Sequence, residues 1–294
     1  MELTCRATPA RPNPFRSPRS VAQIGEPAGS NVYGSFVAIG DSFTEGLDDP
    51  AELGGGYRGW ADRVAERLAE GDPGFRYANL AVRGKLLGEI VAEQLPGVQA
   101  LGPELVSIAG GGNDILRRSC DADALASQMR ETIRSLAATG AHVLAFAGFD
   151  PTRLAPLRSL AERASILNAA CRATTTEVGG TLVDLWQLPV LSDPRMWSVD
   201  RIHLSTEGHR QVASAVLAAL GMENDGSRPA PLPPAPAASW VSSRAADASW
   251  GWHYLRPWLV RRLRGQSSGD AVFAKRPELT PWVLSGRESA SPRG

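Results

Sequence analysis

A serine and a histidine in this sequence have surroundings that suit nucleophilic chemistry. Ser42 follows Gly40 and Asp41 at the end of the apolar run 36–39, where a tight turn can present its hydroxyl to a cleft. His203 follows Asp200 by three residues, and within one turn this spacing lets the carboxylate accept a hydrogen bond from Nδ1–H. Nε2 is then free to take a proton from a serine. Taken singly, both segments are also explained by ordinary turn and capping roles.

Two further segments could supply hydrogen-bond donors to the same crevice. Asn113 follows three glycines, so its amide could point toward Ser42, although an N-cap role explains it as well. Gly84 could offer its backbone N–H without obstruction by a side chain. A phosphate-binding loop at Ser42 is the poorer alternative, because no Walker or Gly-x-Gly-x-x-Gly pattern follows it.

The other histidines and one rival acid lack this combination. His142 begins an expected strand, His209 lies within an expected helix, and His253 belongs to the C-terminal tail. Asp184 ends an expected strand but has no histidine close to it in the sequence. We therefore expect His203 and Asp200, rather than these residues, to be the catalytic histidine and aspartate.

The elements that must position these residues alternate along the chain. Short apolar runs predict five strands, and segments with helical spacing of apolar residues predict helices between them; the strands are 36–40, 75–82, 105–109, 142–146 and 181–185, and the helices are 60–70, 86–95, 121–139, 157–178 and 206–220. We expect Pro96 to stop the second helix. This order predicts an α/β fold with a five-stranded parallel sheet covered by helices on both faces, a three-layer α/β/α arrangement. Ligands bind such sheets at the topological switch point, where strands one and three end.

Four short motifs, in this order, resemble those of the SGNH/GDSL hydrolase family. They are Gly-Asp-Ser (40–42), Gly84 after Asn79, Gly-Gly-Asn-Asp (111–114) and Asp-x-x-His (200–203). The resemblance spans about residues 34–220 and implies a flavodoxin-like fold. Phe43 departs from the leucine that is usual after the nucleophile, a change that we do not expect to abolish the chemistry.

The resemblance also implies roles for these residues. Ser42 would form an acyl-enzyme, His203 would act first as base and then as acid, and Asp200 would orient it. The oxyanion hole would combine the N–H groups of Ser42 and Gly84 with the Asn113 amide. No metal or cofactor is required. The implied function is an esterase or lipase-like hydrolase of small-molecule or lipid esters; the alternatives are an acyltransferase with the same triad and a non-catalytic interaction protein. We expect Asp41 and Asp114 to hold the two loops by local hydrogen bonds.

Composition and charge divide the 294 residues into unlike parts. The formal net charge is zero, and 43% of the residues are hydrophobic, which excludes a wholly disordered chain. Residues 31–220 carry 17 basic and 23 acidic side chains, so we expect no nucleic-acid partner. Three cysteines without a Cys-x-x-Cys motif make a structural zinc site improbable and fit a reducing compartment. With no apolar leader in the N-terminal sequence and no 20-residue apolar window, we expect a cytoplasmic protein without a transmembrane segment.

The sequence predicts four regions. They are a disordered Arg/Pro-rich arm (1–30), the hydrolase-type domain (31–222), a Pro/Ala linker (223–239) and a Trp/Arg-rich tail (240–294). The tail holds five of the eight tryptophans, Trp240, Trp250, Trp252, Trp258 and Trp282. It could contact a membrane surface peripherally, dock a partner protein or pack on the domain itself. We favour packing or docking, because Pro257 would break a helix lying on a membrane.

Overall fold

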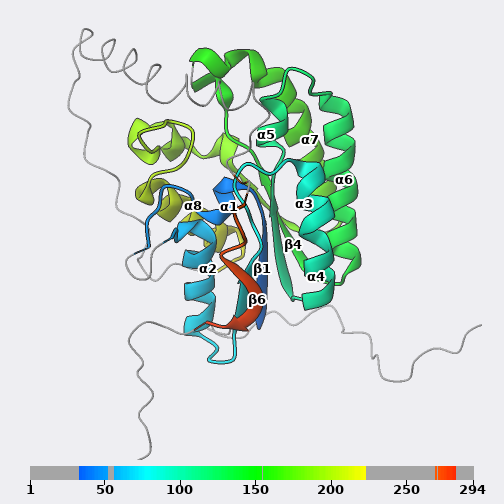
Figure 1. Ribbon diagram of the computed structural model, residues 1–294, viewed down its shortest axis with the longest axis vertical. Coiled ribbons are helices and arrows are strands. Elements are labelled where there is room, and N and C mark those ends of the chain that lie inside the picture. Colours follow the sequence, from blue (N-terminus) through cyan, green and yellow to red (C-terminus); the bar gives the residue numbers. More distant parts are fainter. Residues whose placement is uncertain (1–32, 52–55, 154, 223–268, 270, 283–294) are drawn as a thin grey trace, which may run out of the picture. The chain divides into compact units, whose positions relative to one another are not determined.

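One mixed sheet forms the centre of the protein. The computed structural model describes residues 33–51, 56–153, 155–222, 269 and 271–282. In this part of the chain the sheet contains β1 (Ser35–Gly40), β2 (Arg76–Asn79), β3 (Leu105–Ala109), β4 (His142–Ala147), β5 (Thr181–Asp184) and β6 (Arg276–Pro281), in the spatial order β5-β4-β3-β1-β2-β6 (Figure 1). The first five strands are parallel, and β6 runs antiparallel to β2.

Helices cover both faces of this sheet (Figure 1). One face carries α3 (Leu87–Glu93), α4 (Leu95–Leu101), α6 (Ala122–Ala138) and α7 (Ala161–Glu177), and the other carries α2 (Gly59–Glu70) and α8 (Thr206–Ala219). Two short helices, α1 (Ser42–Glu45) and α5 (Gly112–Ile115), begin just after β1 and β3. The expected three-layer α/β/α architecture is confirmed, and the strand order of β1 to β5 is the flavodoxin-like one.

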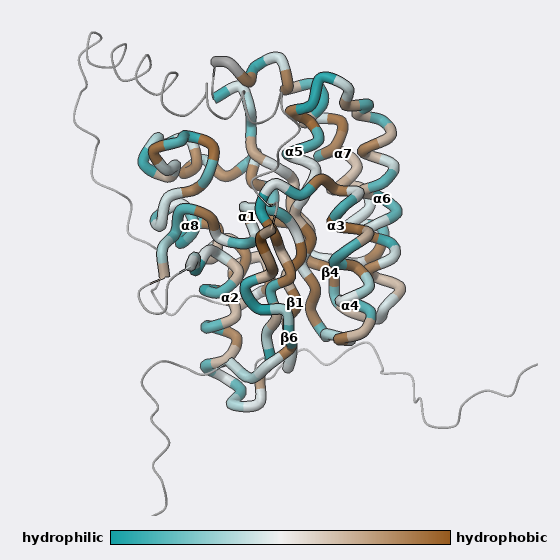
Figure 2. Tube along the Cα trace, in the orientation of Figure 1, coloured by the Kyte–Doolittle hydropathy of each residue, from teal (hydrophilic) through white to brown (hydrophobic). Residues whose placement is uncertain are grey.

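The side chains of β1 alternate between two hydrophobic cores. Phe36 and Ala38 pack with the α2–α8 layer, whereas Val37 and Ile39 pack with the layer of α3, α4, α6 and α7. All four are fully buried, which explains why this strand is apolar without interruption. Figure 2 shows the same hydrophobic concentration along the central strands, with hydrophilic residues on the outer sides of the helices.

The expectation of five strands is wrong by one. The sixth strand, β6, has the sequence Arg-Pro-Glu-Leu-Thr-Pro, which lacks an apolar alternation and contains two prolines. Proline is tolerated at a sheet edge, where its missing N–H faces no partner strand, so this segment forms an edge strand without the usual sequence signal. The Trp/Arg-rich tail therefore contributes one strand to the sheet of the domain that precedes it.

Side chains beside β6 anchor it to the domain. The Trp282 ring packs edge-on against Tyr77, with the ring centroids 5.5 Å apart. Lys275 Nζ lies 2.9 Å from Asp62 and donates hydrogen bonds to the carbonyl oxygens of Tyr57 and Arg58. Packing of the tail on its own domain is thus confirmed for Trp282. The remaining tail tryptophans, Trp240, Trp250, Trp252 and Trp258, lie outside the described residues, as do the arm (1–30) and the linker (223–239).

A second helix, which the sequence did not predict, directly follows the expected one. The segment expected as a single helix over 86–95 forms α3, and Pro96 lies in the first turn of α4 instead of ending α3. A first-turn N–H has no intrahelical acceptor, so a proline there costs no hydrogen bond. Among the described residues, no helix has the length and apolar character that crossing a bilayer requires.

Candidate active site

Ser42 begins α1 at the carboxyl end of β1. The preceding Gly40 has a φ of 152°, and a Cβ there would meet the Ala109 carbonyl oxygen at 2.4 Å, so only glycine fits between the two strands. Asp41 caps α1 by accepting a hydrogen bond from the Phe43 N–H at 3.1 Å. As the first residue of a helix, Ser42 has a backbone N–H without an intrahelical acceptor. Both its hydroxyl and this N–H are therefore available for chemistry at the sheet edge.

His203 and Asp200 come from the loop that precedes α8, and the structure brings them to Ser42. His203 Nε2 lies 3.0 Å from Ser42 Oγ, and His203 Nδ1 lies 2.5 Å from Asp200 Oδ2. Asp200 Oδ1 also accepts hydrogen bonds from the backbone N–H groups of Ile202 and His203, each at 2.9 Å. These bonds fix the carboxylate against the ring, so that Nδ1–H donates to Asp200 and Nε2 faces the serine. The three residues selected from the sequence thus form one hydrogen-bonded series.

The surroundings favour a charged imidazole beside a charged carboxylate. Burial alone would raise the pKa of Asp200, but the hydrogen bond and charge of His203 outweigh it and lower that pKa. Burial would likewise lower the pKa of His203, yet the hydrogen bond and charge of Asp200, followed by the charges of Asp48 and Asp41, raise it. The histidine therefore accepts a proton more readily than an ordinary imidazole, as a general base requires.

Asn113 connects the loop of Ser42 to the segment that contains Gly84. Asn113 Nδ2 donates to Asp41 Oδ2 at 3.2 Å and to the carbonyl oxygen of Lys85, the residue after Gly84, at 3.1 Å. Gly84 has a φ of 77°, in the left-handed region that favours glycine. The expected convergence of the loops after β1, β2 and β3 is therefore present, and the Asn113 amide bridges all three.

Carboxylates hold these loops in place. As expected, Asp41 ties Asn113 to the loop of Ser42, and Asp114 accepts a hydrogen bond from the Leu87 N–H at 3.0 Å. Burial raises the pKa of Asp41 to about 6, against the lowering influence of the Phe43 N–H and the His203 charge. Sequence reasoning missed Glu45, whose carboxylate accepts the Arg83 N–H at 2.8 Å and also pairs with the Arg83 guanidinium. Glu45 thereby fixes the residue before Gly84 to the helix that carries Ser42.

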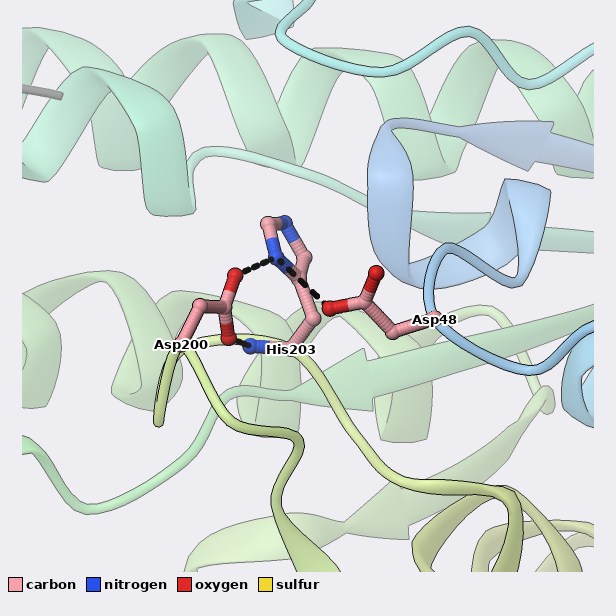
Figure 3. A group of neighbouring side chains, drawn as sticks. All are labelled: Asp48, Asp200 and His203. Atoms are coloured by element: carbon pink, nitrogen blue, oxygen red, sulfur yellow. Dashed lines mark hydrogen bonds and ion pairs between the residues drawn. The ribbon is translucent and has the colours of Figure 1, made fainter. Parts of the chain in front are cut away.

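Two more residues near His203 were also missed. Asp48 Oδ2 lies 4.0 Å from His203 Nδ1, on the side of the ring opposite Asp200 (Figure 3). Ser198 Oγ lies 2.7 Å from Asp48 Oδ2 and 2.7 Å from Asp200 Oδ1, and so links the two carboxylates. Asp48 and Ser198 are 150 residues apart, and neither belongs to a motif. No sequence pattern could have found them.

Asp48, Asp200 and His203 lie close enough together to be considered as ligands of a metal ion. Ligand atoms of Asp48, Asp200 and His203 all lie within 4.8 Å of one another. Their hydrogen bonds account for this arrangement, because Nδ1–H points at Asp200 and cannot ligate a metal while protonated. That the reaction requires no metal or cofactor stays a prediction.

The rejected candidates have other partners in the structure. Asp184 pairs with Arg172 at 2.8 Å. His209 is buried, accepts a hydrogen bond from the Trp60 N–H at Nδ1 and has its pKa lowered by burial to about 4. His142 Nε2 contacts the Thr181 hydroxyl at 2.8 Å. His253 lies outside the described residues.

An aromatic cluster packs around Phe43, and an open cleft lies beside Asp48 and Ser198. Phe43, which replaces the usual leucine, packs its ring against Trp60, Phe146 and Phe149 at centroid distances of 5.4–5.6 Å, so the larger side chain fills the core below Ser42. A cleft of about 690 Å³ opens beside Asp48 and Ser198, and its lining includes polar side chains such as Tyr57, Arg195 and Arg210.

A serine, a histidine and an aspartate in hydrogen-bonded series at the switch point of a flavodoxin-like sheet define a hydrolase-type site. The family model described as "GDSL-like Lipase/Acylhydrolase family" matches residues 38–211, and the chain belongs to that family. The protein is accordingly an ester-bond hydrolase. A comparison with curated proteins finds no match.

Solved structures share the fold. LAE5, described as an alpha/beta hydrolase enzyme from the metagenome of Lake Arreo, is 23% identical with a TM-score of 0.55, and the match covers 67% of this chain and 98% of LAE5. Axe2, an acetylxylan esterase from Geobacillus stearothermophilus, is 20% identical with a TM-score of 0.54, over 66% of this chain and 96% of Axe2. The psychrotrophic esterase EstA from Pseudoalteromonas sp. is 12% identical with a TM-score of 0.52, over 64% and 97%.

Proposed function

We propose that the protein hydrolyses carboxylic esters through an acyl-enzyme on Ser42. The observation that carries this proposal is the continuous series from Ser42 Oγ to His203 Nε2 at 3.0 Å and from His203 Nδ1 to Asp200 at 2.5 Å. An isolated serine hydroxyl is a weak nucleophile at neutral pH, and an adjacent, oriented base is what activates it.

The reaction proceeds in two displacements. His203 Nε2 takes the Ser42 proton as Oγ attacks the ester carbonyl carbon, and the protonated imidazole then gives this proton to the departing alkoxide as the C–O bond breaks. Water next loses a proton to Nε2, attacks the acyl-enzyme and releases the carboxylic acid, after which Ser42 Oγ recovers its proton from the imidazole. Asp200 stabilises the imidazolium in both displacements.

The negative oxygen of each tetrahedral intermediate needs donors on the opposite side of Ser42. The backbone N–H groups of Ser42 and Gly84 and the Asn113 amide supply them. The Asn113 bond to Asp41 is long, at 3.2 Å, so its proton can be shared with the oxyanion as charge develops there.

Two neighbours with the same fold support the assignment. Variants of the Axe2 esterase that replace a serine or a histidine by alanine are described as catalytic mutants. The EstA esterase is described as inhibited by monoethylphosphonate, a reagent class that resembles a tetrahedral acyl intermediate. These descriptions concern those proteins, and the geometry at Ser42 extends the comparison to this one.

The proposal is tested by turnover of p-nitrophenyl esters from acetate to palmitate, together with an acetylated sugar. We expect Ser42→Ala and His203→Ala to lose activity on every substrate, while Ser119→Ala, which removes an exposed hydroxyl, behaves as the wild type. Robust turnover by Ser42→Ala would refute the acyl-enzyme. Products formed with added alcohol acceptors at the expense of hydrolysis would instead identify an acyltransferase, and preference for long acyl chains would identify a lipid substrate.

A further inference from the structure

We propose that Asp48 is a second carboxylate, besides Asp200, that supports the general base His203. It is a positioning residue, held by Ser198, that helps to orient the imidazole and to stabilise its cation. The inference rests on the proposed role of His203 as the base. It concerns a residue from a different segment, since Asp48 follows α1 whereas Asp200 and His203 share the loop before α8 (Figure 3).

The Ser198 hydroxyl couples the carboxylates of Asp48 and Asp200. The Ser198 hydroxyl lies 2.7 Å from both Asp48 Oδ2 and Asp200 Oδ1, but it has one proton and can donate to one of them at a time. Asp200 Oδ1 already accepts the N–H groups of Ile202 and His203, so this proton is best used on Asp48. The hydroxyl oxygen in turn accepts the Asp200 N–H at 3.3 Å. Ser198 therefore holds Asp48 beside the ring at the distance where its charge acts on Nδ1.

The backbone at Asp48 is held in an uncommon conformation. Its φ is 68°, in the left-handed region that non-glycine residues seldom adopt outside turns and functional sites. Buried contacts fix the residues on both sides: His209 Nε2–H donates to the Leu47 carbonyl oxygen at 3.3 Å, and the buried Asp49 accepts the Gly59 N–H at 3.0 Å and pairs with Arg63. This anchoring directs the Asp48 carboxylate at His203 from the side that Asp200 does not reach.

Three carboxylates face His203 from three segments of the described chain. Asp200 comes from its own loop, Asp48 from the turn after α1 and Asp41 from the end of β1, and the charge of each raises the pKa of the imidazole against the effect of burial. Within the described part of the chain, the carboxylates of Asp41 and Asp200 accept backbone N–H groups of α1 and of the loop before α8, whereas that of Asp48 bonds the Ser198 hydroxyl. Removing the Asp48 charge therefore disturbs the other two carboxylates least.

The test uses Asp48→Asn in the full-length protein. Asparagine has nearly the same size and tolerates left-handed backbone well, so the fold should be retained. We expect the acid limb of kcat/KM for p-nitrophenyl acetate to move toward lower pH by about half a unit to one unit, since Asp48 no longer stabilises the protonated imidazole. We also expect kcat at pH 8 to fall about three- to tenfold. Asp123→Asn, which removes an exposed charge on α6, is the matched control and should leave the limb in place.

Combined variants separate this proposal from the assignment of the triad. If Asp48 supports the same imidazole, Asp200→Asn should retain part of its activity through Asp48, and Asp48→Asn/Asp200→Asn should lose at least about a further tenfold. Ser198→Ala breaks the bridge with no change of charge and should shift the limb in the same direction, which keeps the test valid if Asp48→Asn fails to fold. An unshifted limb in both single variants, or a double variant no worse than Asp200→Asn, would overturn the role of Asp48 while Ser42→Ala remains inactive. An active Ser42→Ala would overturn the proposed function instead.

Discussion

The buried carboxyl of Asp41 makes the stability of the protein depend on pH in a way that one substitution should remove. Asp41 accepts hydrogen bonds from the Phe43 N–H and the Asn113 amide, yet burial raises its pKa from 3.8 to about 6. The folded state therefore binds a proton more tightly than the unfolded state does. Its contribution to stability is fully present below about pH 3.8 and is lost as pH rises through about 6.

The size of this effect follows from the shift. A difference of about two pKa units corresponds to about 3 kcal/mol over the whole titration, of which about 2 kcal/mol is lost between pH 4.5 and 7.5. Asparagine at position 41 does not titrate and retains an oxygen that can accept from the Phe43 N–H. The unfolding free energy of Asp41→Asn, taken relative to the wild type, should thus rise by about 2 kcal/mol across this pH range.

Urea denaturation of both proteins at pH 4.5, 6.0 and 7.5 measures this difference. Asp123→Asn serves as the control and should differ from the wild type by the same amount at each pH. The same Asp41→Asn protein should lose about ten- to a hundredfold in kcat, because its one amide oxygen is used on the Phe43 N–H and the NH2 group that replaces Oδ2 cannot accept the hydrogen bond that positions the Asn113 amide. A difference in stability between Asp41→Asn and the wild type that stays constant with pH would refute the reasoning.

Two further variants test other parts of the structure. Asn113→Ala should lower kcat about 10²- to 10³-fold with little change in KM, because its amide hydrogen-bonds the reacting oxygen only as negative charge develops there. Steady-state kinetics on p-nitrophenyl acetate check this, and a rise in KM with kcat unchanged would contradict it. Lys275→Met should lower the free energy of unfolding by about 2–4 kcal/mol, since it removes the cation from the partly buried Asp62 and detaches the segment that leads into β6. Lys85, the other lysine of the chain, pairs with the exposed Glu93, so Lys85→Met should cost below about 1 kcal/mol, and equal losses in the two variants would argue against a structural role for the tail.

The parts of the site that the sequence reveals are local ones. Asp200 and His203 are three residues apart, so one turn suffices to join them, and Ser42 and Asn113 each follow a strand whose apolar run marks its end. Because ligands of such a sheet bind where strands one and three end, Ser42 and Asn113 are then expected in one crevice.

The parts that it does not reveal depend on contacts between distant segments. Ser198 and Asp48 meet across 150 residues, and Glu45 reaches Arg83 across 38, through side chains that belong to no periodic pattern. The edge strand β6 shows a related limit, since its prolines and charged residues resemble a loop until pairing with β2 supplies the backbone partners. Such roles arise from packing, which composition and spacing do not encode.

Covalent labelling decides whether Ser42 is the nucleophile. The full-length protein is treated with a fluorophosphonate, digested and analysed by mass spectrometry, with Ser42→Ala treated in parallel. We expect one phosphonate adduct on the peptide that contains Ser42, slower labelling in His203→Ala, and no adduct in Ser42→Ala. A wild-type protein that turns over esters but carries no adduct on Ser42, or equal labelling of Ser42→Ala, would contradict this expectation.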